Sequence, residues 1–248
     1  MRKLAVSITK GGTGKTTTTV NLAAGLALQG ARVLVVDADS QGQASQMLGL
    51  NPKHGLAEVI SQAAKAEAVA VEARPNLYLL TGGRALAGVR RLIARKDFRS
   101  ERTLVDALDS IEGQYDFVVF DTAPSWDPLT VNVLFYATEI LAPVSLEVLA
   151  IKGLVEFVGN IESIQKYNPD IMLQYVLPTF FDRRVKKSSE ILAQLEAYCE
   201  DKLCPPIRYN VRLSEAPGHR QTIFEYAPKS AGAQDYRKLI ERVQNGRP

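Results

Sequence analysis

Six short runs of apolar residues alternate with stretches of helical pattern, and this alternation is the strongest constraint on the fold. The runs are almost continuously hydrophobic, as strands must be when helices cover both of their faces. They are residues 4–8, 33–36, 77–80, 117–120, 140–144 and 172–177. A helix between two parallel strands makes a crossover unit, so the pattern predicts an α/β fold with a mainly parallel, twisted sheet flanked by helices on both faces.

The segments between these runs have helical periodicity. They are residues 17–28, 41–48, 56–68, 103–111, 148–167, 188–198 and 231–243. A further stretch, residues 84–102, disperses basic side chains among apolar ones and is interpreted as an amphipathic surface helix. The 248 residues suffice for one large core, and we see no linker, repeat or low-complexity segment. We therefore expect a single domain spanning residues 1–248.

The turn between the first predicted strand and the first predicted helix is rich in glycine and lysine. Glycine lets the backbone approach an anion, and a helix N-terminus directs amide groups and partial positive charge toward it. The turn reads Lys10, Gly11, Gly12, Thr13, Gly14, Lys15, Thr16 and Thr17. The alternative is a glycine-rich turn with two solvated lysines, but the flanking strand and helix favour a phosphate-binding P-loop. Lys15 would then reach the β- and γ-phosphates of ATP, and the Thr16 hydroxyl would bind Mg²⁺.

Carboxylates follow two of the predicted strands. Asp37 and Asp39 come after residues 33–36, and Asp121 comes after residues 117–120. Ligands of an open parallel sheet bind beyond the carboxyl ends of its strands, so these side chains should share an edge with the P-loop. Asp121 is placed to help hold Mg²⁺ or a water bound to it. The competing interpretation is that the aspartates cap the following helices, and it applies most readily to Asp37.

The P-loop departs from the usual G-x-x-x-x-G-K-[ST] pattern, since Thr9 stands in place of the first glycine and Lys10 follows it. With this extra lysine the chain resembles the deviant Walker A ATPases of the ParA and MinD group, and in particular the small, Soj-like ParA partition ATPases. Residues 177–184 and 210–217 carry the same resemblance, which spans nearly the whole chain. Because the P-loop begins at residue 10, we expect no N-terminal operator-binding region.

The resemblance implies roles for several residues. Lys10 would cross a dimer interface to the nucleotide of a second copy, and with Lys15 it would neutralise charge that develops on the phosphates. Asp39, in the segment that looks like switch I of the family, would position or activate the attacking water, and Asp37 would lie nearer the metal. Ser40 stands where the family usually has proline, which removes a fixed φ and could leave switch I more mobile.

The later segments are implied to border the nucleotide base. In this interpretation Pro178, Arg212 and Pro217 belong to the cofactor site. The residues after Asp121 look like switch II of the family. Trp126 follows them directly, and we interpret it as a packing residue beside a moving loop.

Basic residues also cluster in these segments. With 30 basic and 27 acidic residues the net charge is only +3, so attraction for nucleic acid must come from local clusters. Taken alone, such charges are most simply a solvated surface. The resemblance implies instead that the ATP-bound dimer binds double-stranded DNA without sequence preference, and residues 84–102 remain a secondary candidate surface. The predicted DNA-binding residues are Arg183, Arg184, Lys186, Lys187 and Arg212.

The two cysteines, Cys199 and Cys204, have no second pair and no nearby histidine. Structural, half-buried thiols are therefore favoured over a metal site. With no charged-then-apolar leader before the P-loop, this cysteine usage favours a reducing cytoplasm. No apolar run reaches membrane-spanning length.

Three function classes compete. The first is a ParA-type switch on the nucleoid that dimerises on ATP, binds nonspecific DNA and positions a plasmid, a chromosome or a protein organelle such as a carboxysome, with hydrolysis stimulated by a ParB-like or adaptor protein. The second is a MinD-type membrane switch, but residues 234–248 have few apolar side chains for an amphipathic anchor. The third is a metabolic P-loop enzyme. An iron-protein reductase would need bridging cysteines within residues 121–132, which hold none, and a synthetase would need a substrate pocket. We favour the first class, with no membrane partner.

Overall fold

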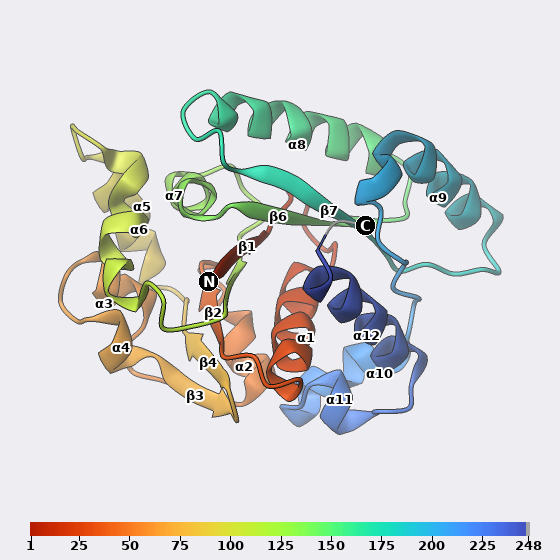
Figure 1. Ribbon diagram of the computed structural model, residues 1–248, viewed down its shortest axis with the longest axis horizontal. Coiled ribbons are helices and arrows are strands. Elements are labelled where there is room, and N and C mark those ends of the chain that lie inside the picture. The colour runs from red at the N-terminus through yellow and green to blue at the C-terminus, as the bar shows by residue number, and fades with distance from the viewer. Residues whose placement is uncertain (247–248) are drawn as a thin grey trace.

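A seven-stranded sheet organises residues 1–246, the part of the chain that this computed structural model describes (Figure 1). Neighbouring strands are parallel except for the first two at one edge, which are antiparallel. The predicted α/β fold with a mainly parallel sheet is confirmed. From one edge to the other the strands are β3 (Val71–Arg74), β4 (Leu77–Leu80), β2 (Val33–Asp37), β5 (Phe117–Asp121), β1 (Arg2–Val6), β6 (Glu139–Ser145) and β7 (Met172–Thr179).

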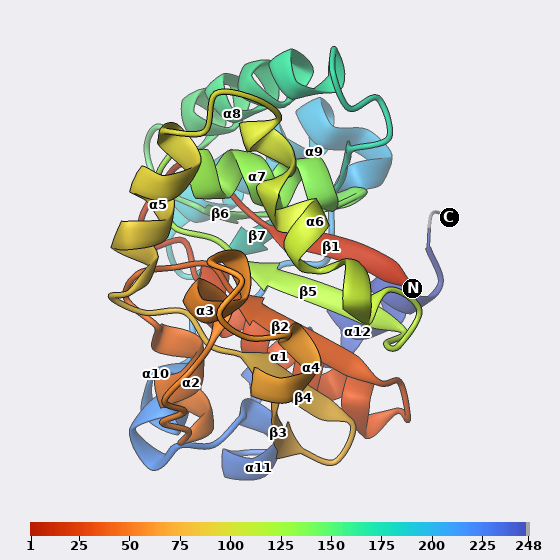
Figure 2. The same ribbon diagram turned by 90° about the vertical axis from the view of Figure 1, so that its left-hand side faces the viewer.

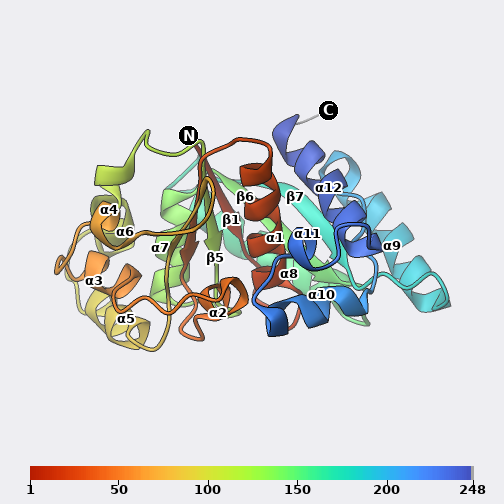
Figure 3. The ribbon, with the colours of Figure 1, turned by 90° about the horizontal axis from the view of Figure 1, so that it is seen from below.

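Helices cover both faces of the sheet, as predicted. One face carries α1 (Lys15–Leu28), α2 (Gln43–Leu48), α11 (Ile223–Tyr226) and α12 (Ala231–Gln244), with α10 (Val211–Glu215) beside α11 (Figure 3). The other carries α3 (Leu56–Ile60), α4 (Ala66–Val69), α5 (Leu86–Ala94), α6 (Thr103–Ala107), α7 (Pro128–Tyr136), α8 (Ala150–Gln165) and α9 (Lys186–Cys199). Figure 2 shows α5, α6 and α7 close together on this second side. Short 3-10 turns follow several helices, at Ser100–Arg102, Asp109–Ile111, Glu200–Lys202 and Ala216–His219.

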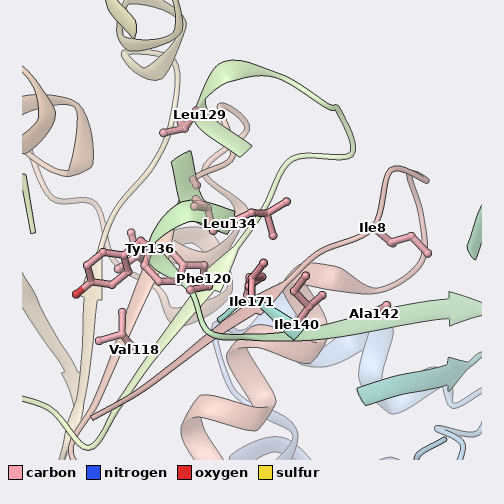
Figure 4. Packing of buried hydrophobic residues seen from close by; sticks show 14 of the residues in the cluster. Ile8, Val118, Phe120, Leu129, Leu134, Tyr136, Ile140, Ala142 and Ile171 are labelled. Atoms are coloured by element: carbon pink, nitrogen blue, oxygen red, sulfur yellow. The ribbon is translucent and has the colours of Figure 1, made fainter. Parts of the chain in front are cut away.

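Each central strand contributes side chains to two separate cores, because successive residues of a strand point to opposite faces. In β2, Val33 and Val35 pack beneath α1 while Leu34 and Val36 face the layer of α5 and α7. In that second core the ring of Phe120 meets Tyr136 edge to face, with centroids 5.4 Å apart (Figure 4). Truncating a fully buried aromatic ring of this kind to alanine costs about 3–5 kcal/mol. The continuous apolar runs are therefore the signature of strands sandwiched between helix layers.

Three helices expected from the sequence are interrupted, so those predictions were wrong in extent. Residues 103–111 form α6 and the separate 3-10 turn Asp109–Ile111. Residues 56–68 form α3 and α4 rather than one helix, and Gln62 between them has a left-handed φ of 62°. Residues 84–102 form α5 and the short 3-10 turn Ser100–Arg102 rather than one long helix, and the buried Leu86, Val89 and Ile93 of α5 lie at helical spacing. The apolar spacing does not continue beyond Ile93, and Phe98 is 79% exposed. Most of the stability of a helix comes from packing of its apolar face, so the helix ends where apolar side chains no longer contact the core.

The structure also contains elements that the sequence analysis missed. Helix α7 begins after Asp127, whose side chain accepts hydrogen bonds from the backbone N–H groups of Leu129 and Thr130. Pro128 occupies the first helical position, so Asp before Pro was an available start signal. Strand β3 left no comparable signal, because its half-exposed residues become a strand only by pairing with β4.

Helix α12 packs its apolar face against α1 (Figures 1 and 3). The buried residues of that face include Tyr236, Leu239, Ile240 and Val243. The fit is close: a Cβ added at Gly25 of α1 would lie 1.9 Å from Ile240 Cδ1. The apolar face of α12 is therefore buried in the core. No helix within residues 1–246 is both long and apolar enough to cross a membrane.

Both cysteines carry free thiols and are buried, more deeply than the half-buried positions predicted. Burial raises the pKa of Cys199 to about 11 and that of Cys204 to about 12. Thiols with such raised pKa values stay protonated and unreactive near neutral pH. Residues 1–246 hold no group of three or more His, Cys, Asp or Glu side chains arranged to bind a metal ion.

Candidate nucleotide and magnesium site

The P-loop connects β1 to α1 and forms the floor of a pocket of about 520 Å³. Gly12 and Gly14 have φ values of 71° and 85°, a left-handed conformation that only glycine adopts without strain. Gly14 is also the N-cap of α1, so the amide groups of the first turn open toward the pocket. Gly11, Lys15, Thr16 and Thr17 line it too, whereas Thr13 is buried and its carbonyl accepts a hydrogen bond from the Thr179 hydroxyl.

Lys15 is the buried cation of this pocket. Its Nζ donates a 2.8 Å hydrogen bond to the carbonyl oxygen of Lys10. Burial lowers the pKa of its amine, against the opposing attraction of Asp121 and Asp39. The lysine is thus held at the bottom of the P-loop by a neutral partner, from which it can turn to phosphate oxygens.

Asp121 is the last residue of β5 and is fully buried. Its Oδ1 accepts a 3.4 Å hydrogen bond from the Thr19 hydroxyl, while Oδ2 is buried without a hydrogen-bond partner in residues 1–246. Burial raises the pKa of the Asp121 carboxyl to about 7, although the nearby Thr16 hydroxyl opposes the shift. An orphaned carboxylate oxygen beside the Thr16 hydroxyl is chemically suited to Mg²⁺ or to a water bound to it. The residues present therefore fit the predicted metal, and the roles of Thr16 and Asp121 stay predictions.

Asp37 lies opposite Asp121 in the register of β2 and β5 and is equally buried. Its Oδ1 accepts from the Asp39 N–H at 3.0 Å, and its Oδ2 accepts from the Ala44 N–H at 3.2 Å. Burial and the nearby charge of Asp121 raise the pKa of Asp37 well above its usual value. Asp37 thus shapes switch I and caps the approach to α2, the alternative that the sequence left open. Direct metal ligation by Asp37 stays a prediction.

Asp39 is half-buried and lines the pocket together with Ser40 and Gln41. Its Oδ1 accepts a 3.0 Å hydrogen bond from the Gln41 N–H, which leaves Oδ2 available at the pocket wall. Gly82 supports this loop from behind: a Cβ there would lie 2.5 Å from the Asp37 carbonyl oxygen and 2.6 Å from that of Asp39. The predicted water-handling carboxylate is therefore held in place by backbone packing.

Lys10 does not share the pocket of Lys15. Its Nζ lies 2.9 Å from Glu147 Oε2 and 3.4 Å from Ser145 Oγ, and the side chain borders a separate hollow that Lys152 also lines. The structure thus separates the two lysines that the sequence analysis grouped as catalytic. This geometry does not favour a contact between Lys10 and a nucleotide bound to the P-loop of the same chain.

A smaller hollow of about 220 Å³ adjoins the phosphate pocket, since Gly14, Thr17 and Phe180 line both. Pro217 lines it, in the position predicted for the nucleotide base, with Asn210 among its other lining residues. Pro178 and Arg212 do not line it. Pro178 is buried within β7, where Thr179 and Phe180 reach the hollow instead, and Arg212 points to Glu215 at 2.8 Å.

The sequence analysis missed Phe180 and Arg90 as lining residues of the phosphate pocket. Phe180 adopts a left-handed φ of 57°, which no motif signalled. Arg90 belongs to residues 84–102, the basic stretch for which the sequence predicts a surface helix. Trp126 is 38% exposed and meets the ring of Phe157 edge on, with centroids 6.4 Å apart, so it packs on one side only.

The predicted DNA-binding residues lie on two neighbouring loops, because the Tyr209 N–H donates to the Phe181 carbonyl at 2.9 Å. Arg183, Arg184, Lys186 and Lys187 are exposed at the start of α9, and Arg212 is exposed on α10. Several of them form exposed ion pairs: Arg184 with Asp182 at 2.7 Å, Lys186 with Glu190 at 3.7 Å and Arg212 with Glu215 at 2.8 Å. Water screens such exposed pairs and each contributes little, so another anion could replace the carboxylates at little cost.

Comparisons with known proteins show the family of this chain. A family model described as an AAA domain matches residues 1–173. The chain is 35% identical over 247 residues to the sporulation initiation inhibitor protein Soj of Bacillus subtilis, covering 97% of each chain. It is 37% identical over 245 residues to the chromosome-partitioning ATPase Soj of Thermus thermophilus, covering 98% of this chain and 95% of that relative.

A solved structure is similar over nearly the whole chain as well. The cobyrinic acid a,c-diamide synthase of Mycobacterium smegmatis, with a bound ATP analogue and magnesium, has a TM-score of 0.86 and 32% identity, covering 99% of this chain and 95% of that one. The fold and the pocket define a P-loop ATPase with ATP and Mg²⁺ as cofactors. More narrowly, the chain belongs to the Soj/ParA family of partition ATPases, which confirms the predicted resemblance.

Proposed function

We propose that this chain is an ATP-dependent switch that dimerises on ATP, binds DNA without sequence preference and positions a cargo. The observation that carries the proposal is the place of Lys10 outside its own phosphate pocket. Its partner, Glu147, has a side chain that is 67% exposed, so their ion pair costs little to break. Lys10 can then reach the nucleotide of a second copy when two P-loops face each other across a two-fold axis.

Each protomer contributes the remaining chemistry. When bound, Mg²⁺ neutralises charge on the phosphate oxygens. Lys15 holds the same oxygens from below, and the Asp39 carboxylate at the pocket wall orients the attacking water. Asp121 and Thr16 would hold the metal. Hydrolysis would remove the terminal phosphate on which Lys10 of the second copy depends, and so release the dimer.

Dimerisation also supplies a reason for DNA binding. Two protomers present two copies of the loops that hold Arg184 and Arg212, so weak phosphate contacts become bivalent. Avidity can raise affinity by about 10² without any new contact. A ParB-like or adaptor protein on a plasmid, chromosome or protein cargo would stimulate hydrolysis and release the switch from the nucleoid.

Light scattering with and without ATP tests the dimer. The Asp39→Ala variant should block turnover and accumulate a dimer with ATP. Adding Lys10→Ala to it should weaken that dimer while the fold is retained. Lys152→Ala is the matched control, because this lysine borders the same hollow but pairs with Glu156 on α8. A protein that stays monomeric with ATP when hydrolysis is blocked would contradict the proposal.

DNA binding is tested separately by charge reversal. The double change Arg184→Glu and Arg212→Glu should abolish ATP-dependent binding and leave nucleotide binding intact. Lys53→Glu with Lys65→Glu, two lysines elsewhere on the surface, matches the change in net charge. Equal loss in both double variants would show only a net-charge effect and would remove the two arginines from the interface.

A metabolic role is the second candidate, favoured by the 32% identity to a diamide synthase over almost the whole chain. Such an enzyme would form an amide on a carboxylate substrate while consuming ATP. Incubation with ATP, Mg²⁺, cobyrinic acid and an amino donor tests it, and an amidated product would replace the switch proposal. A membrane switch is less favoured, because the apolar face of α12 is buried against α1.

A further inference from the structure

Arg90 is the second cation of the phosphate pocket. Within residues 1–246, the positively charged side chains lining that pocket are Lys15 from the P-loop and Arg90 from α5. Arg90 does not line the adjoining hollow that Pro217 borders. It is therefore associated with the phosphate end of the site, on the wall shared with Asp39 and with the residues that follow Asp121.

The guanidinium of Arg90 has unused hydrogen-bond donors. Its Nε and Nη2 are buried and form no hydrogen bond with any residue from 1 to 246. Nε lies 3.0 Å from Asp127 Oδ2, but this ion pair does not have hydrogen-bond geometry. The Asp127 oxygens already accept from the N–H groups of Leu129 and Thr130 and from the Ser125 hydroxyl. Asp127 thus compensates the charge of Arg90, while the Nε and Nη2 donors have no hydrogen-bond acceptor within residues 1–246.

Buried donors without acceptors are costly, and in a native protein they call for a missing partner. The planar fork of a guanidinium matches phosphate oxygens, to which it can donate two parallel hydrogen bonds. The pocket beside Arg90 is built for phosphates by Gly12, Gly14 and Lys15. A phosphate oxygen is therefore the acceptor best suited to the unpartnered donors of Arg90.

Arg90 also adjoins switch II. Ala123, Pro124 and Ser125 line the same pocket, and Asp127 ends this segment by capping α7. Helices α5 and α7 are in contact and lie close together in Figure 2. The segments that must close around the terminal phosphate, switch I through Asp39 and switch II through Ser125, thus share the pocket with Arg90.

We propose that Arg90 contacts the terminal phosphate of bound ATP and makes the site prefer ATP over ADP. This contact comes from the same chain as the P-loop, unlike the one proposed for Lys10. It requires only the ATPase site, so it can hold or fail independently of dimerisation and DNA binding.

Nucleotide affinity tests the contact directly. Titrations of fluorescent ADP and of a fluorescent, slowly hydrolysed ATP analogue, both with Mg²⁺, give the Kd of each for the full-length protein. Arg90→Ala should raise the Kd of the ATP analogue by about tenfold or more, as loss of a charge-assisted hydrogen bond does, and change that of ADP less than about twofold. Arg90→Lys should retain part of the preference, because it keeps the charge and loses the fork.

Two controls separate contact from packing. Arg91→Ala alters the neighbouring, exposed arginine and should leave both affinities unchanged. Asp127→Ala removes the cap of α7 and should lower the melting temperature without changing the ratio of the two affinities. The proposal is overturned if Arg90→Ala leaves the ratio as in the wild type or weakens both nucleotides equally. It is also overturned if Asp127→Ala reproduces the loss of preference, since Arg90 would then act only through switch II.

Discussion

The phosphate edge of the sheet and the two basic loops are both rich in charge, yet the fold prepares them very differently. At the phosphate edge, Asp37 and Asp121 are fully buried, and Gly12 and Gly14 of the P-loop are held in left-handed conformations. In the basic loops, Arg184 and Lys186 have side chains that are 85% and 91% exposed and pair with near neighbours in sequence, Asp182 and Glu190. The phosphate edge is preorganised by burial and by its backbone conformation. The basic loops are a group of solvated charges whose small contributions add together.

The difference follows from solvent. Burial raises the pKa of Asp121 to about 7, and one of its oxygens has no hydrogen-bond partner within residues 1–246, so this region should gain most from a metal ion. Exposed charges interact through water and salt, and each contributes little alone. Single changes at the phosphate edge should therefore be severe, and single changes in the basic loops should be mild.

The largest effect is expected at Asp39. Asp39→Ala should lower the rate of ATP hydrolysis by about 10²-fold or more, because the carboxylate that we propose orients water is removed, while ATP binding is retained. Steady-state phosphate release and an equilibrium binding assay check both parts. Asp97→Ala, which removes an exposed carboxylate near the end of α5, is the control. Hydrolysis at the wild-type rate would assign water handling to another residue.

Gly82 tests how far backbone packing shapes the phosphate edge. Gly82→Ala would place a Cβ within 2.6 Å of the carbonyl oxygens of Asp37 and Asp39 and should lower the free energy of unfolding by about 2–4 kcal/mol. Gly88→Ala on α5 meets open space and should be neutral or stabilising by about 0.5–1 kcal/mol. Chemical denaturation measures both. If the two variants changed the free energy of unfolding equally, switch I could move away from the added Cβ without loss of stability.

We expect Asp121 to make the site sensitive to pH. With a pKa of about 7, its carboxyl must lose a proton before it can bind Mg²⁺, so Mg²⁺ affinity in the presence of ATP should rise by roughly tenfold from about pH 6 to pH 8. Titrations of Mg²⁺ at both pH values measure this. Asp121→Asn should weaken binding and flatten the dependence. An unchanged pH profile in that variant would exclude Asp121 as the source.

The same carboxyl links stability to pH when Mg²⁺ is absent. Its pKa is raised in the folded chain, so the folded state binds the proton more tightly than the unfolded state. The free energy of unfolding should therefore fall as pH rises from about 4 to about 7, with the loss complete above the folded pKa. Asp37, whose pKa is also raised, acts in the same direction. Thermal melts of the wild type and of Asp121→Asn compare the slopes.

The smallest effect is expected for one exposed arginine. Arg184→Ala should weaken ATP-dependent DNA binding by only about three- to fivefold and reduce the log–log salt slope by about 0.9 for each DNA phosphate that the protein no longer neutralises. Fluorescence anisotropy at several salt concentrations measures the slope. Loss of all binding from this single change would mean that the basic loops are preorganised after all, and the contrast between the two regions would fail.

Much of this molecule was readable from the sequence because its signals are local. The P-loop, the strand ends at Asp37 and Asp121 and most helices follow from glycine conformation and from apolar runs whose period reflects burial. The boundaries of β4 were predicted to the residue, and those of β1 were displaced by two. The helix over residues 56–68 and the strand β3 were misjudged, since their structure depends on neighbours distant in sequence.

By itself, the sequence determined the fold class, the phosphate-binding turn and the family, because each rests on residue types at fixed spacing along the chain. Only the tertiary structure decided which charges meet. Lys10 pairs with Glu147 and lies outside the pocket of Lys15. The oxygens of Asp37 accept hydrogen bonds from the backbone N–H groups of Asp39 and Ala44. Arg90 of helix α5 lines the phosphate pocket. The physical reason is that electrostatic interactions depend on distance and burial in space, and no spacing along the chain records either.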